Sequence, residues 1–461
     1  TTYTSVVAND QTHTYLAGPG GIGGVGGIYT VKITGVFPGL AMYRATVARR
    51  AQLVSFLNWG INPIKSLYGA FYYCTNMTYE ATDAPNLSEL DVAPVSSGNA
   101  QQMFNACSSI TELDLSGWTN TDKITSLYFS FNTLSALTLL NLTDWDVSNV
   151  TRADQCFRSI GTAGAGCEVI MPGLDWSGAT HANGLLQLFV STKFSTAPDF
   201  SNWNFRATGN ARLEYCFYVC DGAFALDLSS WTNTGSGTNL AHFLRSTEFT
   251  SVNMTGWDTS NCTDFQYMFA ASTNLTHVTG LNDFDSSSAG SLKFMFQGTS
   301  NFTFGAHGST TNFDDVKWGD NLGGATSMYQ TFDAAGGGVN LPPDLSNWDV
   351  SGVTTAYKAF FASHWTAPVD FSNWDFSGLT VSTGLQYFFY DQEGTTVVDF
   401  TNADIPSTIT NMSFMFPYSE VESVTWGAGC DFSNVTTFQN NCTSANVTSY
   451  EFNATADFSS L

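Results

Sequence analysis

The chain has 461 residues, of which 43% are hydrophobic and 15% aromatic, so it has ample material for a folded core. Only 12% of the residues are charged, and 39 acidic against 15 basic residues give a formal net charge of −24. That charge disfavours binding to nucleic acids and to anionic membranes. No apolar run reaches the ~18 residues that a membrane-spanning helix needs.

Residues 1–36 are expected to form a small β segment. The run Tyr29–Thr34 alternates between the two faces of a strand and is rich in β-branched residues. The glycine-rich span Gly18–Gly27 has few side chains to bury, so we expect a long hairpin tip. Residues 37–60 are expected to form a cap, because the first coil of a repeat array has a face that no earlier coil covers.

Residues 61–461 repeat one pattern roughly every 26–28 residues. A tryptophan, or a residue in its place, is followed by an aromatic residue that closes the unit. The closing residues are Phe71, Phe104, Phe131, Phe157, Phe189, Phe217, Phe243, Phe269, Phe296, Phe332, Phe360, Phe389, Phe416 and Phe438. These units, about fourteen in number, predict a repeat solenoid, in which stacked coils bury a core that one unit could not bury alone.

The pattern changes twice within a unit. Triplets such as Leu113–Leu115 alternate like a short, half-buried strand, and Ser-Gly-Trp or Thr-Asp-Trp then supplies turn residues. After the tryptophan, apolar residues recur at helical spacing, as in Ile124, Leu127 and Phe131. Each coil is therefore expected to contain a short strand, a turn and a short helix, as in a leucine-rich-repeat-like solenoid.

The repeat also resembles a known family. LDLSGWTNTDKITSLYFSF and VNMTGWDTSNCTDFQYMF are similar to the LDLSxWDTSNVTxMxxMF repeat of BspA-like leucine-rich-repeat surface proteins, and this resemblance extends over residues 61–461. Within residues 1–36, HTY followed by YTVKITG resembles the last two strands of a PKD-like β-sandwich. The BspA-like resemblance implies a surface-displayed repeat array with adhesive or structural roles and no enzyme activity.

Aromatic residues at a fixed phase of the repeat are expected to form buried ladders, because an inward-facing stack needs the same position in every coil. His242, next to Phe243, is expected to lie in this core. His364 and Trp365 fall outside the phase and are the candidate exposed binding residues. The ladder residues are Trp118, Trp145, Trp203, Trp231, Trp257, Trp348, Trp374, Phe131, Phe157, Phe217, Phe269, Phe296, Phe360 and Phe416.

Aspartates recur beside the expected strands, and two roles fit them. Their carboxylates can cap local Asx turns, or they can share calcium ions between coils, although no D-x-D-x-D-G loop is present. No other metal site and no cofactor are expected. The aspartates are Asp114, Asp144, Asp146, Asp175, Asp227, Asp258, Asp285, Asp349 and Asp375.

The cysteines and the asparagines raise further possibilities. Cys74, Cys107 and Cys220 share one repeat position, which favours buried thiols. In an oxidising compartment, Cys74–Cys107 and Cys430–Cys442 are the expected disulfides. In a eukaryotic or viral source, Asn-x-Ser/Thr sequons are possible glycosylation sites. These are Asn76, Asn141, Asn149, Asn253, Asn261, Asn301, Asn434, Asn446 and Asn453.

The sequence contains no recognisable catalytic motif, so we expect a protein that is not an enzyme. One hypothesis is an adhesion protein at a cell or virion surface, whose rigid solenoid contacts a glycan or a cell-surface protein. The alternative is a structural subunit that assembles end to end with copies of itself into an extracellular filament, sheath or virion appendage.

Overall fold

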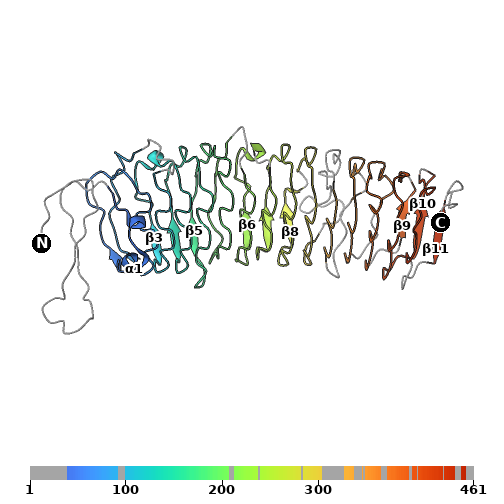
Figure 1. Cartoon of the computed structure of the whole chain (residues 1–461), viewed down its shortest axis with the longest axis horizontal. Helices are drawn as coiled ribbons and strands as arrows, with labels where there is room; N and C mark the ends of the chain where they lie inside the picture. Colours follow the sequence, from blue (N-terminus) through green and yellow to red (C-terminus); the bar gives the residue numbers. More distant parts are fainter. Residues whose placement is uncertain are drawn as a thin grey trace.

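The computed structural model describes residues 39–91, 99–206, 212–236, 239–281, 284–303, 327–336, 345, 348–364, 371–393, 397–401, 403–428, 430–441 and 448–452. The chain folds into a β-solenoid of about twelve turns, whose coils stack along one axis into an elongated rod (Figure 1). The predicted repeat solenoid is confirmed. The predicted β segment of residues 1–36, including Gly18–Gly27 and Tyr29–Thr34, lies outside the described residues.

The start of the described chain packs on the first coil. It contains the 3-10 turn η1 (Met42–Arg44) and the only α-helix of the described residues, α1 (Val47–Arg50). The backbone N–H groups of Met42 and Tyr43 donate to the carbonyl oxygens of Ala70 and Gly69, at 3.3 and 3.2 Å. The described part of the predicted capping segment, residues 39–60, is therefore hydrogen-bonded to the coil that follows.

Short parallel strands line one side of the rod, and Figure 1 shows them stacked coil upon coil. They pair in the orders β1–β2, β3–β4–β5, β6–β7–β8 and β11–β10–β9, and the 3-10 turns η2 (Thr121–Lys123) and η3 (Thr234–Ser236) lie between strands. The strands are β1 (Ser55–Phe56), β2 (Thr78–Tyr79), β3 (Glu112–Asp114), β4 (Leu139–Asn141), β5 (Glu168–Ile170), β6 (Ala225–Asp227), β7 (Ser251–Asn253), β8 (His277–Thr279), β9 (Val397–Phe400), β10 (Ser423–Trp426) and β11 (Ser449–Phe452).

The strands point one apolar residue inward, as their alternation predicts. Leu113, Leu140 and Val169 occupy matching places in β3, β4 and β5, and each is at most 1% exposed. The residues on either side of them face outward or are half-buried. Stacking in register thus places apolar side chains directly above one another along the core.

In the coils that the structure describes, the predicted short helix after the tryptophan is wrong. The stretch from Leu127 to Thr133 consists of successive turns, and Phe129 and Thr133 have φ of 56° and 58°. The N–H groups of Leu127, Phe131 and Thr133 donate to carbonyl oxygens of the next coil at 2.8, 3.0 and 2.8 Å. Bonds between coils replace the i to i−4 bonds of a helix and offset the strain of left-handed residues.

One closing residue also differs from the prediction. In the seventh unit the residue midway between the two left-handed residues His242 and Ser246 is Leu244, and not Phe243. The N–H of Leu244 donates to the carbonyl oxygen of Met268 in the next coil at 2.8 Å. The sequence pattern favoured the aromatic residue, whereas the backbone places its aliphatic neighbour in this ladder position.

Candidate functional site

The aromatic ladders lie inside the solenoid, so they are scaffold. All the ladder tryptophans and phenylalanines are at most 5% exposed. Their rings stack between coils, as in Phe189–Phe217, whose centroids lie 5.4 Å apart with an interplanar angle of 3°. The Nε1–H groups of Trp203 and Trp231 donate to the carbonyl oxygens of Met171 and Phe200 at 2.6 and 3.0 Å. The ladder therefore also satisfies polar groups within the core.

Most of the recurring aspartates cap turns. Asp227 Oδ1 accepts hydrogen bonds from the backbone N–H and the hydroxyl of Ser229, at 3.0 and 2.7 Å. Asn253 makes the same contacts with Thr255, at 3.1 and 2.7 Å, so this position needs an acceptor oxygen and not a negative charge. Equivalent backbone bonds occur at Asp114, Asp146, Asp175, Asp258, Asp285, Asp349 and Asp375.

Cys74 and Cys107 are buried free thiols in the structure, and not the predicted disulfide. The Cys107 thiol donates to the carbonyl oxygen of Phe71 at 3.0 Å. In another coil Thr192 donates to the carbonyl of Phe157 in the same way, so the thiol takes the place of a hydroxyl. Burial raises the pKa of Cys74 to about 12, which keeps this thiol protonated and unreactive at neutral pH.

The second predicted disulfide rests on Cys442, which lies outside the described residues. Its expected partner, Cys430, is a buried free thiol. This thiol donates to the carbonyl oxygen of Ala403 at 3.3 Å, which is again a bond to the preceding coil.

Several sequon asparagines hold neighbouring coils together. The Nδ2 of Asn149 donates to the carbonyl oxygen of Asp122 at 2.9 Å, and Asn76, Asn261, Asn301 and Asn434 make similar bonds across coils. The side-chain oxygens of Asn141 and Asn253 cap turns instead. Asn446 and Asn453 lie outside the described residues. A structural role therefore explains much of the Asn-x-Thr pattern.

Of the two candidate binding residues, the structure describes His364. Trp365 lies outside the described residues. His364 is half-buried, and its Nδ1 lies 3.7 Å from an Oε2 of Glu393 in the next coil. Both side chains of this pair are more than one-third exposed, so its contribution to stability is small.

A second set of aromatic rings, absent from the predictions, lies at the surface. We call it the outer ring row. Its members are half-buried, and each stacks on or touches the next along the rod. They are Tyr215, His242, Tyr267, Phe294, Tyr329, Tyr357, Tyr387 and Phe414. His242 is therefore a member of this surface row and not a core residue.

The first four rings of the row form a continuous stack. Tyr215 and His242 have ring centroids 4.3 Å apart, His242 and Tyr267 are 4.7 Å apart, and Tyr267 and Phe294 are 4.3 Å apart. Their interplanar angles are 8°, 19° and 5°. The ring faces therefore cover one another, and the parts open to solvent are ring edges and substituents.

Basic side chains lie against this row. The guanidinium carbon of Arg245 is 4.5 Å from the Tyr267 ring centroid, and the Nζ of Lys358 is 5.3 Å from that of Tyr387. Such cation–π contacts contribute about 0.5–1 kcal/mol each at exposed sites. Tyrosine and arginine together are typical of protein surfaces that bind a partner.

His242 should make stability depend on pH. Burial, and to a lesser degree the charge of Arg245, lower its pKa to about 4 from the ordinary 6.5. Between pH 6.5 and 4 the unfolded chain therefore binds a proton that the folded chain excludes, so stability falls as the pH falls through this window. Replacing His242 by glutamine should shrink this fall, measured as the melting temperature of both proteins from pH 7 to pH 4.

Glutamine suits this comparison because Gln155 and Gln187 stand at the same place in other coils, with φ of 56° and 60°. Carboxylates titrate in the same range, but they are common to both proteins and cancel in the difference. A constant gap in melting temperature between wild type and His242→Gln across this range would contradict the prediction.

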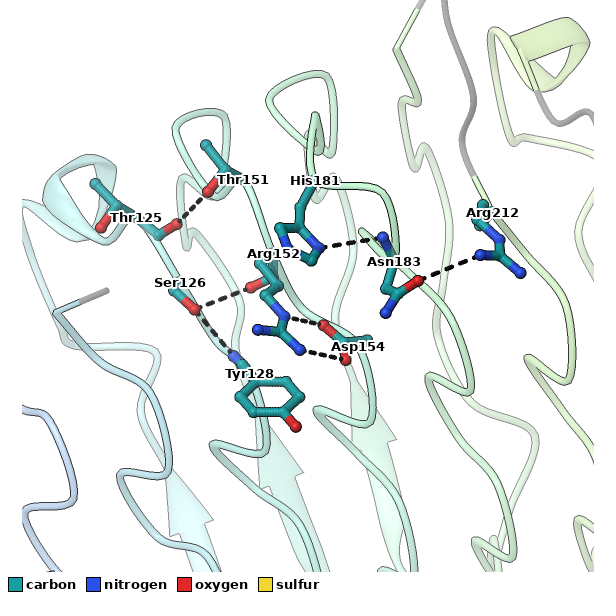
Figure 2. A network of polar contacts seen from close by, with 9 residues as sticks. All are labelled: Thr125, Ser126, Tyr128, Thr151, Arg152, Asp154, His181, Asn183 and Arg212. Atoms are coloured by element: carbon teal, nitrogen blue, oxygen red, sulfur yellow. Dashed lines mark hydrogen bonds and ion pairs between the residues drawn. The ribbon is translucent and has the colours of Figure 1, made fainter. Parts of the chain in front are cut away.

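A polar hollow lies at the surface over the coils that surround Arg212. It is lined by Thr180, His181, Ala182, Arg206, Arg212, Glu214, Asn239 and Thr263. Figure 2 shows His181 and Asn183 on one coil, Arg212 on the next coil, and Arg152 and Asp154 on the coil before. Arg212 Nη2 lies 2.6 Å from Glu214 Oε1, just as Arg152 Nε lies 2.5 Å from Asp154 Oδ1.

Two negative findings apply to the described part of the chain. No group of three or more His, Cys, Asp and Glu side chains is placed there to hold a metal ion. No helix there is long and apolar enough to span a membrane.

Comparison with known proteins identifies one family. A family model described as "Mycoplasma protein of unknown function, DUF285" matches residues 41–164, 183–308 and 326–455. The three matches follow one another and together take up most of the chain. No curated protein and no solved structure matches it.

Proposed function

This chain belongs to the DUF285 family, and we propose that it is a non-enzymatic binding protein, displayed at a cell or virion surface, whose solenoid binds a glycan. The observation that carries this proposal is the outer ring row. The core is already filled by the buried tryptophan and phenylalanine ladders, so half-buried rings such as Tyr267 and Tyr387 are not needed to close it. Aromatic side chains kept at a surface are typical of binding sites.

The regularity of the row favours an extended ligand that itself repeats. Each coil of the outer ring row offers one ring, so weak contacts at several rungs can add up to avidity. The surface is poor in charge, with 12% charged residues in the chain. It therefore offers mainly hydroxyl and amide groups, which suit the hydroxyl groups of a sugar chain.

The resemblance to BspA-like surface proteins supports surface display and adhesion. The roles of the polar residues support a protein that is not an enzyme. The carboxylate of Asp227 is occupied by turn contacts, and the Cys107 thiol is buried and hydrogen-bonded. Asp227 thus has a structural role, and the buried Cys107 thiol is not free to act as a nucleophile.

Binding of the full chain to a glycan array tests the proposal. A double variant, Tyr267→Gln with Tyr387→Gln, should lose most of the binding. Glutamine occupies the same place at Gln102, Gln155 and Gln187, all with positive φ, so these changes keep a residue that the backbone accepts.

Tyr128→Gln is the matched control. Tyr128 is also half-buried, but it lies outside the outer ring row. The guanidinium carbon of Arg152 lies 3.6 Å from the centroid of its ring. This variant should bind as the wild type does. If the double variant retains full binding to the array, the outer ring row is not the contact surface. If the wild type binds proteins and no glycan, its partner is a protein and not a glycan.

A structural subunit is the second candidate. β11 (Ser449–Phe452) pairs with β10 on one side and is the outer strand of its sheet among the described residues. An outer strand offers backbone groups that another copy could pair with. Sedimentation and electron microscopy should then show end-to-end assemblies that lengthen with concentration, and a monomer at all concentrations would contradict this candidate.

A further inference from the structure

The geometry of the polar hollow points to a binding site for an acidic sugar residue, held through its single carboxylate. This inference rests on the proposed function, because it names a chemical class of glycan. The residues that carry it are Arg206, Arg212 and Glu214, together with Thr180, His181 and Asn239, and all of them line the hollow.

Arg212 is fixed in place by its neighbours. Its Nε and Nη2 lie 2.7 and 2.6 Å from Glu214 Oε1, and its Nη1 donates to Asn183 Oδ1 at 3.2 Å (Figure 2). A guanidinium has five N–H groups, so these contacts leave others for a ligand. A pre-positioned guanidinium loses little entropy when it binds a carboxylate.

Arg206 supplies a second positive charge. It is half-buried, and within the described part of the chain its guanidinium has no hydrogen-bond or ion-pair partner. Arg212 and Glu214 neutralise each other, so the hollow keeps a positive charge on Arg206. In a chain of net charge −24, such a site suits an anionic group.

Glu214 holds Arg212 from within the same hollow. Its side chain is 3% exposed, and its Oε2 has no hydrogen-bond partner. This oxygen is buried, so Glu214 serves to position Arg212 and does not contact the ligand. Thr180 and Asn239 offer hydroxyl and amide groups for the sugar in the hollow.

The net charge of the protein limits the ligand to few negative charges. At physiological ionic strength the field of a charge decays over about 8 Å, so distant carboxylates act weakly on a single ligand carboxylate. A polyanion would extend beyond the hollow over the acidic surface and would be repelled. One acidic sugar in an otherwise neutral glycan satisfies both conditions.

Isothermal titration of the full chain with N-acetylneuraminic acid and with glucuronic acid, each beside its methyl ester, tests the inference. At least one acid should bind, and its ester should bind at least about tenfold more weakly, because a charge-assisted hydrogen bond is lost. Equal binding of acid and ester, or no binding of either acid, would overturn it. Acetate that binds as tightly as the acids would overturn the recognition of a sugar.

Arg206→Gln should weaken binding of the acid at least about tenfold. Arg158→Gln is the matched control, because Arg158 is another half-buried arginine, outside the hollow, that bonds Gln155 Oε1 at 2.8 Å. It should bind the acid as the wild type does. Unchanged binding by Arg206→Gln would overturn the assignment.

The two proposals fail in different ways. If Tyr267→Gln with Tyr387→Gln abolishes array binding while neither acid binds, the glycan-binding function stands and the hollow does not. If an acid binds through Arg206 while the ring-row variants keep all array binding, the hollow stands and the outer ring row is not the contact surface.

Discussion

Replacing Trp203 by alanine is expected to destabilise the solenoid by about 3–5 kcal/mol, the range for deleting a buried tryptophan. Its side chain is 0% exposed and stacks on Trp231 with centroids 5.1 Å apart and an interplanar angle of 8°. It also touches Trp176 and donates its Nε1–H to the carbonyl oxygen of Met171. The substitution would open a cavity between coils and leave that carbonyl without this donor.

The damage should be local, because coils of a solenoid contact only their neighbours. Amide hydrogen exchange should therefore speed up most around Trp176 and Trp231 and least near Trp374, while the melting temperature falls. Val381→Ala is the control, since Val381 is 42% exposed and its loss should change stability by less than about 0.5 kcal/mol. A uniform rise in exchange along the whole rod would show that the coils unfold as one unit and would contradict the prediction.

The buried part of the fold was predictable because it repeats. Trp203 and Phe217 recur at one phase of the sequence, and a residue that recurs in each coil must face the same way in each coil. The turn role of Asp227 was likewise one of the two open possibilities, and the bond from Ser229 selects it.

The turns that replace the predicted helix could not be foreseen, because the same apolar spacing fits both a helix and this backbone. Leu127 and Phe131 lie four residues apart and both point inward, as they would on a helix. What distinguishes the real backbone is the partner of each N–H group, which lies in the next coil. A pattern within one coil carries no information on bonds between coils.

The outer ring row escaped prediction because its position is not uniform in residue type. Gln187, Tyr215 and His242 share one left-handed position, whereas Tyr357 stands one residue before the left-handed Lys358, so neither one residue type nor one position marks the row. Only the stacking of coils shows that aromatic residues at these two neighbouring positions form one row.

The polar hollow was also not predictable from a single coil, because residues of several coils line it. Thr180, Arg212 and Asn239 belong to different coils. Arg212 and Asn239 stand at matching places of neighbouring coils, but Thr180 stands at another place, so the repeat alone does not bring the three together. Asn149 matches a glycosylation pattern, and its amide also donates to the carbonyl oxygen of Asp122 in the coil before it.

Replacing Gly178 by alanine should destabilise the protein by about 3 kcal/mol, the upper part of the range for overpacking. A Cβ at this position would overlap the carbonyl oxygen of Ser148 in the preceding coil, and it would lie 3.2 Å from that of Val150. Backbone atoms cannot move aside as a flexible side chain can. The two coils would have to separate, which would lengthen the hydrogen bonds between them.

Gly378 gives the same prediction a second test in another coil. A Cβ there would overlap the carbonyl oxygen of Ser351 and would lie 3.1 Å from that of Val353, so Gly378→Ala should also destabilise the protein by about 3 kcal/mol. Gly117→Ala is the control, because no atom lies within 4 Å of a Cβ there and its φ is not left-handed. It should change stability by less than about 1 kcal/mol, since alanine also restricts the unfolded chain. Urea unfolding of all three variants decides the matter: equal midpoints would mean that the spacing of coils yields to a methyl group, whereas two low midpoints and one near wild type would mean that direct backbone contact sets that spacing.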